Sequence, residues 1–301
     1  MDLNGNQPRW RLVDRILAIY GVLVAVLALT RIGRPGIPLV LAAHLAIPAL
    51  AWMTVHARDS AVMRVLRNIY PLLLLTGLYS AIDVLNGFGA AGTWDHQIQL
   101  IEHAIFGMQP SRDWWRMHPS VFWSTILHAT YLSYYLIVAV PVIVMLIAGR
   151  GESLEPYLDG LITTYLICYL FYLFVPVAGP YYEFPRPSGL FVANLPARMV
   201  YSALRGGSAY GAAFPSSHVA ATVAATVGVW RASPRWGAIL AIPTGMLVVA
   251  VVYCQMHYAV DSGCGLILGV TVAGLAGHRA HQAVARKRET QANPHLPSVV
   301  S

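Results

Sequence analysis

Long apolar stretches, bounded by arginine, proline and glycine, recur along most of the chain. Eight of them are candidate transmembrane helices, at about 12–30, 37–57, 68–88, 120–148, 157–177, 214–231, 236–255 and 258–278. A helix needs about 20 apolar residues to cross roughly 30 Å of hydrocarbon. Helices also satisfy their own backbone hydrogen bonds inside a bilayer. The pattern predicts an all-α fold, a polytopic membrane bundle of about eight transmembrane helices.

Two long stretches between these spans, 89–119 and 178–213, are rich in glycine, proline, tryptophan and tyrosine. Function is expected in such loops. In the first, Ile98, Ile101 and Ile105 recur at spacings of three and four beside polar residues, which predicts a short helix along the membrane surface. The polar tail from about 282 onward is expected to be mobile.

Composition supports a membrane protein, because 57% of the residues are apolar and only 11% are charged, against about 25% charged in soluble domains. The net charge of +7 comes from cations between the spans, which is an orientation signal. A cytoplasmic N-terminus would place thirteen of the twenty cations inside, with loops 89–119 and 178–213 extracytoplasmic. The other seven cations are Arg31, Arg34, Arg112, Arg116, Arg186, Arg198 and Arg205.

Several classes of protein are disfavoured by the same composition. No basic run is interleaved with aromatic residues, so nucleic acid is not an expected partner. The three cysteines, Cys168, Cys254 and Cys264, have no metal-ligand spacing and predict neither a disulfide framework nor a zinc site. The first apolar stretch lacks an obvious cleavage site and is interpreted as a retained span.

The residues Phe214 to His218 open an apolar helical run, with a proline and serines typical of a helix start. A helix N-terminus offers unpaired N–H groups and a positive dipole end, which together favour an anion. His218 would then stand beside a bound phosphate. In the alternative interpretation, Ser216 or Ser217 merely caps the helix and His218 lies among lipid headgroups.

A second polar pair, His257 and Asp261, stands four residues apart in an apolar stretch. On a helix such side chains share one face and can touch. A carboxylate that binds one imidazole nitrogen fixes the tautomer, which leaves the other nitrogen free as a nucleophile or base. The alternative is a buried structural ion pair, although ionisable residues at membrane depth are more often functional.

These stretches resemble the type-2 phosphatidic acid phosphatase superfamily, whose second and third motifs are PSGH and SRxxxxxHxxxD. Pro215, Ser216 and His218 match the second motif, and His257 and Asp261 match the third. The resemblance implies that His257 attacks phosphorus to form a phosphohistidine, Asp261 orients it and His218 protonates the departing oxygen. It implies no metal and no other cofactor.

The chain departs from the family pattern at two cations that hold phosphate oxygens. The third motif's arginine falls on Val251, and the lysine of the first motif, KxxxxxxRP, would fall on Gly179 if Arg186 and Pro187 form its end. The candidates for binding phosphate or substrate are therefore Ser216, Ser217, Arg186, Arg205 and Gln255.

Other stretches are more similar to the branch that contains inositol phosphorylceramide synthases. Trp94 and Asp95 followed by Glu102, Phe106 to Gly107 and Pro110 resemble its segment ahead of the core, and residues 176–182 (PVAGPYY) resemble a core loop. The resemblance implies a six-helix core at 68–280, preceded by two additional helices in 1–67 and followed by a cytoplasmic tail at 281–301.

The sequence thus predicts an enzyme that acts on a phospholipid or polyprenyl phosphate at the extracytoplasmic face. Water as acceptor would make it a phosphatase, and a polyol or lipid hydroxyl would make it a phosphotransferase. A catalytically inactive lipid-binding or scaffold protein and a transporter remain alternatives. Asp83 could also face the site, whereas His44 and His128 are expected to be core or interface residues.

Overall fold

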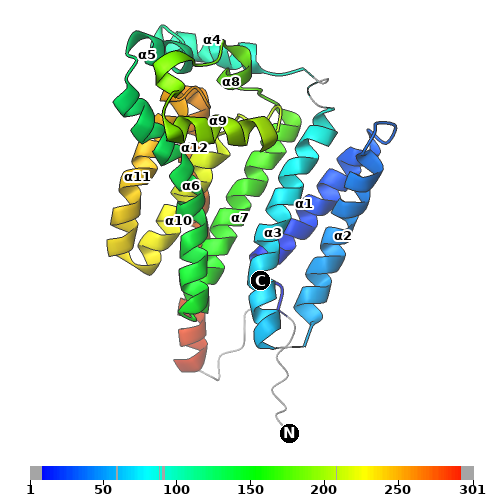
Figure 1. Cartoon of the computed structure of the whole chain (residues 1–301). Coiled ribbons are helices and arrows are strands. Elements are labelled where there is room, and N and C mark those ends of the chain that lie inside the picture. Colours follow the sequence, from blue (N-terminus) through cyan, green and yellow to red (C-terminus); the bar gives the residue numbers. More distant parts are fainter. Residues whose placement is uncertain (1–8, 59, 88, 90–91, 208, 293–301) are drawn as a thin grey trace.

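The computed structural model describes residues 9–58, 60–87, 89, 92–207 and 209–292, and its regular structure there is helical apart from one isolated bridge between Val177 and Ala212. Figure 1 shows the helices in a single bundle. In chain order they are α1 (Leu12–Leu29), α2 (Ile37–His56), α3 (Ala61–Asn86), α4 (Asp95–Phe106), α5 (Pro110–Met117), α6 (Val121–Ile147), α7 (Gly151–Phe174), α8 (Pro180–Glu183), η1 (Gly189–Val192, a 3-10 helix), α9 (Leu195–Gly207), α10 (Ser217–Ala232), α11 (Pro234–Tyr253) and α12 (Ala259–Ala292).

The predicted all-α membrane bundle is confirmed, with each of the eight apolar stretches forming a helix. Seven described helices, all except α10 among the eight, are long and apolar enough to cross a membrane. The 16 residues of α10 reach only about 24 Å at 1.5 Å per residue. This helix instead occupies the interior of the bundle, where it packs against α6, α7, α11 and α12.

Small residues explain how α10 becomes central. Ala220, Ala221 and Ala225 are completely buried, so neighbouring backbones can approach it closely. On α12, a side chain at Gly265 would meet the Ser216 carbonyl at 2.6 Å, and one at Gly269 would meet the Ala220 carbonyl at 2.4 Å. Glycine at these two positions permits the contact that joins the start of α10 to the start of α12.

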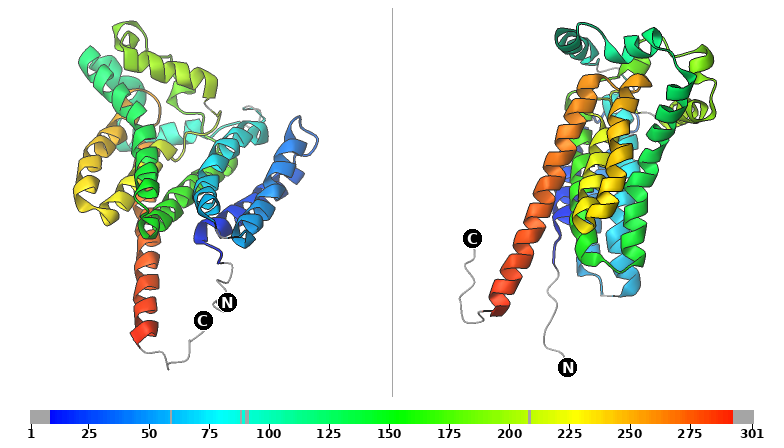
Figure 2. Two further views of the ribbon diagram at one scale, coloured as in Figure 1. Left: turned by 60° about the horizontal axis from the view of Figure 1, so that its bottom comes forward. Right: turned by 90° about the vertical axis from the view of Figure 1, so that its left-hand side faces the viewer.

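The first two helices lie along one edge of the bundle, beside α3 (Figures 1 and 2). The buried Asp14 of α1 holds them there: its carboxylate accepts hydrogen bonds from the Arg11 and Arg67 guanidinium groups and from the Tyr70 hydroxyl. Arg67 and Tyr70 belong to α3. This ionic network therefore anchors the start of α1 against α3.

Short helices cover one end of the bundle, hereafter the covered end, with α4, α5, α8 and α9 lying across it (Figure 1). The surface helix expected from the isoleucine spacing is α4, in which Ile98 is buried while Ile101 and Ile105 are exposed. The first residues of α1 and the last of α12 lie at the opposite end (Figure 2).

The last helix is longer than its apolar pattern indicates. Its apolar part matches the predicted span 258–278, but the helix continues through Ala292. The predicted polar tail from 282 is therefore helical to that point, because a helix that leaves a bilayer needs no further apolar residues. The rest of the predicted tail, 293–301, lies outside the described residues.

Candidate active site

The two stretches that carry His218 and His257 meet at the covered end of the bundle. The His257 Nδ1 atom lies 3.0 Å from the Ala213 carbonyl oxygen. The Ser216 N–H donates to the Asp261 carbonyl at 3.0 Å. The turn before α12 therefore lies directly against the turn before α10, and His218 and His257 face each other.

The spacing of four predicts that His257 and Asp261 share a helix, but in the structure only Asp261 is helical. His257 lies in the turn between α11 and α12, and its N–H and that of Met256 both donate to the Val251 carbonyl at 2.9 Å. Its Nδ1 atom is 3.6 Å from Asp261 Oδ2, a distance for an ion pair, while the Ala213 carbonyl provides the closer acceptor. Because acceptors surround Nδ1, the geometry favours a proton there and leaves Nε2 with a lone pair.

Burial lowers the pKa of His257 to about 4, although its hydrogen bond to the Ala213 carbonyl opposes that shift. The imidazole is therefore neutral at ordinary pH. A neutral ring with its proton on Nδ1 presents Nε2 as a nucleophile.

His218 stands opposite that nitrogen, on the first turn of α10. Its Nδ1 atom is 3.5 Å from His257 Nε2, and its Nε2 atom is 3.1 Å from the Tyr131 hydroxyl. If Tyr131 donates to His218 Nε2, then His218 carries its proton on Nδ1 and points it toward His257. Tyr131 is a site residue that the sequence motifs do not include: α6 is rich in tyrosine, but nothing in that pattern distinguishes Tyr131 from its neighbours.

Asp261 is completely buried, yet its carboxylate is only partly satisfied. Oδ2 accepts the Tyr258 N–H at 2.9 Å, while Oδ1 has no hydrogen-bond partner among the described residues. A buried polar atom without a partner is costly. Such costs are typical of functional sites, where the missing partner comes with a ligand or with a change of charge.

Behind Asp261, the buried Glu102 of α4 caps the start of α12. Its Oε1 atom accepts the N–H of Ala259 and, at 3.2 Å, that of Val260. Burial raises the pKa of Glu102 to about 7, against the effect of the two backbone hydrogen bonds, and the nearby Asp261 raises it further. Glu102 therefore fixes the helix turn that carries Asp261.

Asp95 connects the two upstream stretches on which the branch-level resemblance depends. Its carboxylate accepts the N–H groups of Ala178 and Gly179, each at 2.7 Å, and the Tyr258 hydroxyl at 3.0 Å. Trp94 also donates its N–H to the Pro176 carbonyl at 2.8 Å. The segment 176–182 is thus held against the turn that carries His257.

The two positions where the family has phosphate-binding cations are closed in this chain. Gly179 has a φ of +92°, which side chains rarely adopt, and a Cβ there would lie 2.8 Å from that of Ala213. Val251 is completely buried among apolar residues of α11 and its neighbours. Neither position has room for a lysine or an arginine without a local change of the fold.

The two candidate arginines lie at the surface of the covered end. The Arg186 Cζ atom is 4.6 Å from the ring centroid of Tyr181, a residue that lines the large cavity described below. Arg205 is exposed in the last turn of α9. The described contacts bring neither arginine to His218 or His257.

The two serines of the motif differ in role. Ser216 is completely buried and caps α10, its hydroxyl accepting the Val219 N–H at 3.4 Å. Ser217 lines the large cavity, and its N–H donates to the Tyr172 hydroxyl at 3.1 Å. Ser216 thus follows the structural alternative, while Ser217 faces the space where a substrate would lie.

Gln255 lies beside the site, but its side chain is used by the protein itself. Its Nε2 atom donates to the carbonyls of Pro180 and Pro185, both at 3.1 Å, so both amide hydrogens are engaged. Its oxygen accepts from Trp115 at 2.9 Å and from Arg116 at 3.1 Å. Gln255 thus ties α5 to the loop around α8 in this structure, and its role in binding phosphate stays a prediction.

The remaining polar candidates are not in the site. Asp83 accepts the Tyr210 N–H at 2.7 Å and so fixes the loop before α10. His44 and His128 are buried, and each directs Nδ1 to the backbone carbonyl four residues earlier, at 2.7 Å. These two histidines are core residues, as expected. Within the described residues, no three His, Cys, Asp or Glu side chains form a group that could hold a metal ion.

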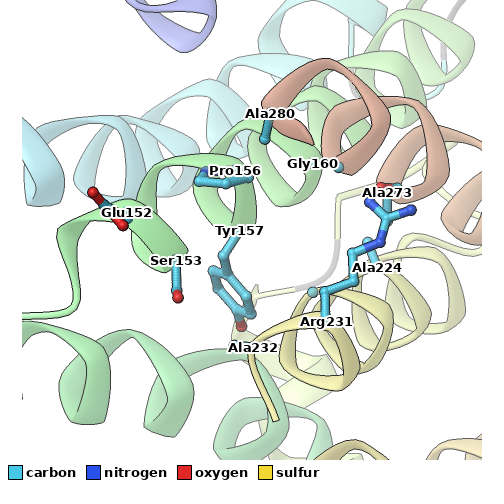
Figure 3. Close-up of a pocket in the computed structure, with 12 residues that line it drawn as sticks. Glu152, Ser153, Pro156, Tyr157, Gly160, Ala224, Arg231, Ala232, Ala273 and Ala280 are labelled. Carbon is cyan, nitrogen blue, oxygen red and sulfur yellow. Dashed lines mark hydrogen bonds between the residues drawn. The ribbon is translucent and has the colours of Figure 1, made fainter. Parts of the chain in front are cut away.

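His218 and His257 open onto a cavity of about 680 Å³ that is walled by α3, α6 and α7 and covered by α9. A second cavity, of about 160 Å³, lies near the opposite end between α7, α10 and α12. Figure 3 shows Arg231 extending there toward Ala273, to whose carbonyl it donates at 2.7 Å. Because that guanidinium is already bound to helix carbonyls and no histidine lines the space, the larger cavity is the candidate active site.

Comparison with known proteins identifies a family for the chain. A family model described as the PAP2 superfamily matches residues 96–276, more than half of the chain, and the match includes His218, His257 and Asp261. No curated protein and no solved structure matches the chain. The helical membrane bundle and the family match agree, and the chain belongs to the PAP2 superfamily, the type-2 phosphatidic acid phosphatase superfamily that its motifs resemble.

Proposed function

We propose that the protein is a lipid phosphatase or phosphotransferase that works through a phosphohistidine on His257. Membership of the superfamily suggests phosphatase-type chemistry in a membrane protein. The observation that carries the proposal is the approach of His257 Nε2 to His218 Nδ1, at 3.5 Å, at the end of a large cavity. One imidazole can act as the nucleophile while the other transfers protons.

In the first step, the lone pair of His257 Nε2 attacks phosphorus and the bond from phosphorus to the lipid oxygen breaks. The negative charge of the bound phosphate favours the imidazolium form of His218 against the effect of burial, and that imidazolium gives a proton to the departing oxygen. His257 gains positive charge as the bond forms, and the Asp261 carboxylate near Nδ1 stabilises it. Because the two nitrogens now lie too close for a phosphoryl group between them, substrate binding must move the rings apart.

In the second step, water or an alcohol attacks the phosphohistidine and His218 removes the proton from the incoming oxygen. The bond from phosphorus to Nε2 breaks and restores the neutral imidazole. Water yields a phosphatase, whereas a polyol or lipid hydroxyl yields a phosphotransferase, as in the inositol phosphorylceramide synthase-like interpretation. The proposed hydrogen-bond donors to the phosphate oxygens are the His218 N–H, Ser217, Arg186 and Arg205. None of the proposed steps uses a metal ion.

The partly unsatisfied carboxylate of Asp261 favours an enzyme over a scaffold protein. A scaffold would gain nothing from a buried carboxylate that has no cation beside it, whereas a catalyst uses its charge when His257 becomes cationic. A transporter is disfavoured because the sequence shows no paired repeats.

We further propose that the covered end faces the extracytoplasmic side, because the cations concentrate at the other end. A cysteine placed at exposed Ser202, on α9, should react with an impermeant reagent added to intact cells, whereas one at Ser233 should not. The reverse pattern would reverse the proposed orientation.

The function is tested by quenching the purified protein after exposure to lipid labelled at phosphorus, with and without a polyol acceptor. We expect an acid-labile, base-stable phosphoprotein and release or transfer of the label, both of which persist in EDTA. Loss of turnover in EDTA with recovery in magnesium would contradict the metal-free mechanism. Turnover of lipid without any trapped phosphoprotein would contradict the histidine nucleophile.

A further inference from the structure

The large cavity extends along the bundle and opens through its side. Along α6 its lining runs from Tyr131 to Leu146, which at 1.5 Å per residue is roughly 20 Å of the bilayer's hydrocarbon thickness of roughly 30 Å. Figure 1 shows α7 between α3 and α6, so α7 forms the floor. Leu73, Tyr135 and Ile143 line the cavity and are 68%, 56% and 53% exposed, so the opening faces the lipid.

The lining has two zones that differ in chemistry. The part far from the histidines is aliphatic, with Leu72 on α3 and Val142 and Leu146 on α6. The part near the histidines is rich in tyrosine, and half of the chain's sixteen tyrosines line this one cavity. They are Tyr79, Tyr131, Tyr134, Tyr135, Tyr165, Tyr169, Tyr181 and Tyr182.

The hydroxyl hydrogens in the tyrosine zone are not all used by the protein. Tyr134 and Tyr165 bond to each other through their hydroxyls, which engages one of their two hydrogens. The Tyr79 hydroxyl accepts the Ala209 N–H at 3.1 Å, which leaves its own hydrogen available. By contrast, Tyr169 donates to the Leu75 carbonyl and Tyr131 contacts His218. Two donors therefore remain among these five tyrosines, in a largely apolar space where an unpaired donor is costly.

The Tyr134–Tyr165 pair lies a short distance from the reaction centre. The ring centroid of Tyr134 is 4.6 Å from that of His218, and its hydroxyl touches Tyr165 on α7. The first oxygen atoms beyond the phosphoester of a bound lipid would therefore reach the tyrosine zone, and the rest of the chain would reach the aliphatic zone. A lipid whose tail is hydrocarbon from the phosphoester onward offers these hydroxyls no acceptor.

We propose that the tyrosine zone is a binding site for an acyl carbonyl, so that the substrate is a phosphorylated lipid with an ester or amide carbonyl close to the phosphoester. This inference rests on the proposed function and narrows its substrate class. Tyr79 and the Tyr134–Tyr165 pair donate to the carbonyl, while the aliphatic zone holds an acyl chain. A polyprenyl phosphate lacks that carbonyl and is a poorer substrate.

The test compares lipids that differ only in this group, using the purified full-length protein. Diacylglycerol phosphate and ceramide phosphate supply an ester and an amide carbonyl, dialkylglycerol phosphate supplies an ether oxygen alone, and a polyprenyl phosphate supplies neither. We expect turnover of at least one carbonyl lipid to exceed that of the dialkyl lipid about tenfold, the range for one or two hydrogen bonds. Equal rates for the diacyl, ceramide and dialkyl lipids, or a preference for the polyprenyl phosphate, would overturn the proposal.

Variants assign the preference to the hydroxyls. In Tyr134→Phe/Tyr165→Phe, and separately in Tyr79→Phe, the turnover of the preferred carbonyl lipid should fall about five- to tenfold while that of the dialkyl lipid changes little. Tyr20→Phe removes the hydroxyl of a buried tyrosine on α1, outside the cavity, and should leave the ratio of the two rates unchanged. Equal losses for both lipids in the cavity variants would contradict a carbonyl site.

A binding measurement separates this inference from the proposed function. His257→Ala protein, which lacks the proposed nucleophile, is titrated with the diacyl, ceramide and dialkyl lipids against a fluorescent lipid reporter. If carbonyl lipids bind about tenfold more tightly, the carbonyl site stands even where no turnover is found and the proposed function fails. If turnover is found but carbonyl and dialkyl lipids bind equally, the function stands and the carbonyl site fails.

Discussion

Two buried aspartates, Asp14 and Asp261, lie near opposite ends of the bundle and differ in how the protein satisfies them. Both side chains are completely inaccessible to solvent. Asp14 accepts from two arginines, from a tyrosine hydroxyl and from the Arg11 N–H. Asp261 accepts one N–H, has no lysine or arginine among its described partners and keeps one oxygen without a partner.

The difference separates a carboxylate that stabilises the fold from one that is available for chemistry. A buried charge requires partners, and breaking such a pair destabilises a protein strongly. At Asp14 the protein supplies those partners permanently. At Asp261 the nearest cation would be His257 itself, once its ring is phosphorylated or protonated. The substitutions below should therefore affect stability at one end and rate at the other.

The largest effect is expected at the nucleophile. His257→Ala should abolish both turnover and the trapped phosphoprotein, because the atom that bonds to phosphorus is gone. His218→Ala should slow an alkyl lipid ester far more than p-nitrophenyl phosphate, whose leaving oxygen needs little protonation. Rates with the two esters measure the contrast. Full activity in His257→Ala would contradict the mechanism. If His218→Ala slows both esters by the same factor, His218 is a phosphate ligand and not a proton donor.

A matched pair of substitutions tests the two aspartates directly. Asp261→Asn should lower kcat by about 10³-fold or more while thermal unfolding changes little, as when the orienting carboxylate of another triad is neutralised. Asp14→Asn should lower the free energy of unfolding by about 3 kcal/mol, because the buried Arg11 and the half-buried Arg67 lose their counter-ion, while kcat per folded molecule is retained. Unfolding in detergent and steady-state rates provide the two readouts. A loss of kcat in Asp14→Asn together with a loss of stability in Asp261→Asn would contradict the assigned roles.

Glu102 provides a pH-dependent form of the comparison. Its pKa rises from an ordinary value near 4.5 to about 7 in the folded protein, chiefly because the carboxyl is buried. The folded state then binds the proton more tightly than the unfolded state, so stability should fall by about 3 kcal/mol as pH rises from about 4.5 to about 7.

Glu102→Gln should remove that part of the pH slope, measured by unfolding at a series of pH values. It also retains an oxygen that can cap α12. An unchanged slope would show that Glu102 does not titrate in this range.

The smallest effect is expected at Tyr131, a positioning residue that acts through His218. Tyr131→Phe should lower kcat about tenfold with little change in KM, because the tautomer and orientation of His218 are no longer fixed. The pH profile of kcat should also shift, which a purely structural loss would not cause. An unaltered profile together with a general loss of folded protein would assign Tyr131 to packing alone.

The sequence predicts the helices well because a continuous apolar run specifies a membrane span without long-range information. The exceptions are informative. α10 is shorter than a span because its neighbours, and not lipid, surround it, and α12 continues past its apolar run because charged residues such as Arg279 also form helix. Boundaries set by neighbours or by water do not appear in an apolar pattern.

For the site, the motifs identify the three central residues, and the structure brings them together; their catalytic roles stay predictions. The residues that support them depend on contacts between distant segments, so no local pattern could reveal that Tyr131 binds His218 or how Glu102 caps α12. The contacts of Gln255 are hidden from the sequence for a related reason. Its φ of +59° turns the side chain toward α5 and the α8 loop, and a sequence carries no signal for that turn.

The cover over the histidines is fastened by four hydrogen bonds to Gln255, whereas the cavity is open toward lipid through exposed side chains such as Leu73 and Ile143. A substrate that enters by this route arrives by diffusion in the plane of the bilayer and not from bulk water. The quantity that saturates the protein is then the mole fraction of substrate among all lipids. Diluting the substrate with inert lipid at constant bulk concentration should slow turnover, whereas diluting whole vesicles with buffer, at constant composition, should not change the rate per protein embedded in them.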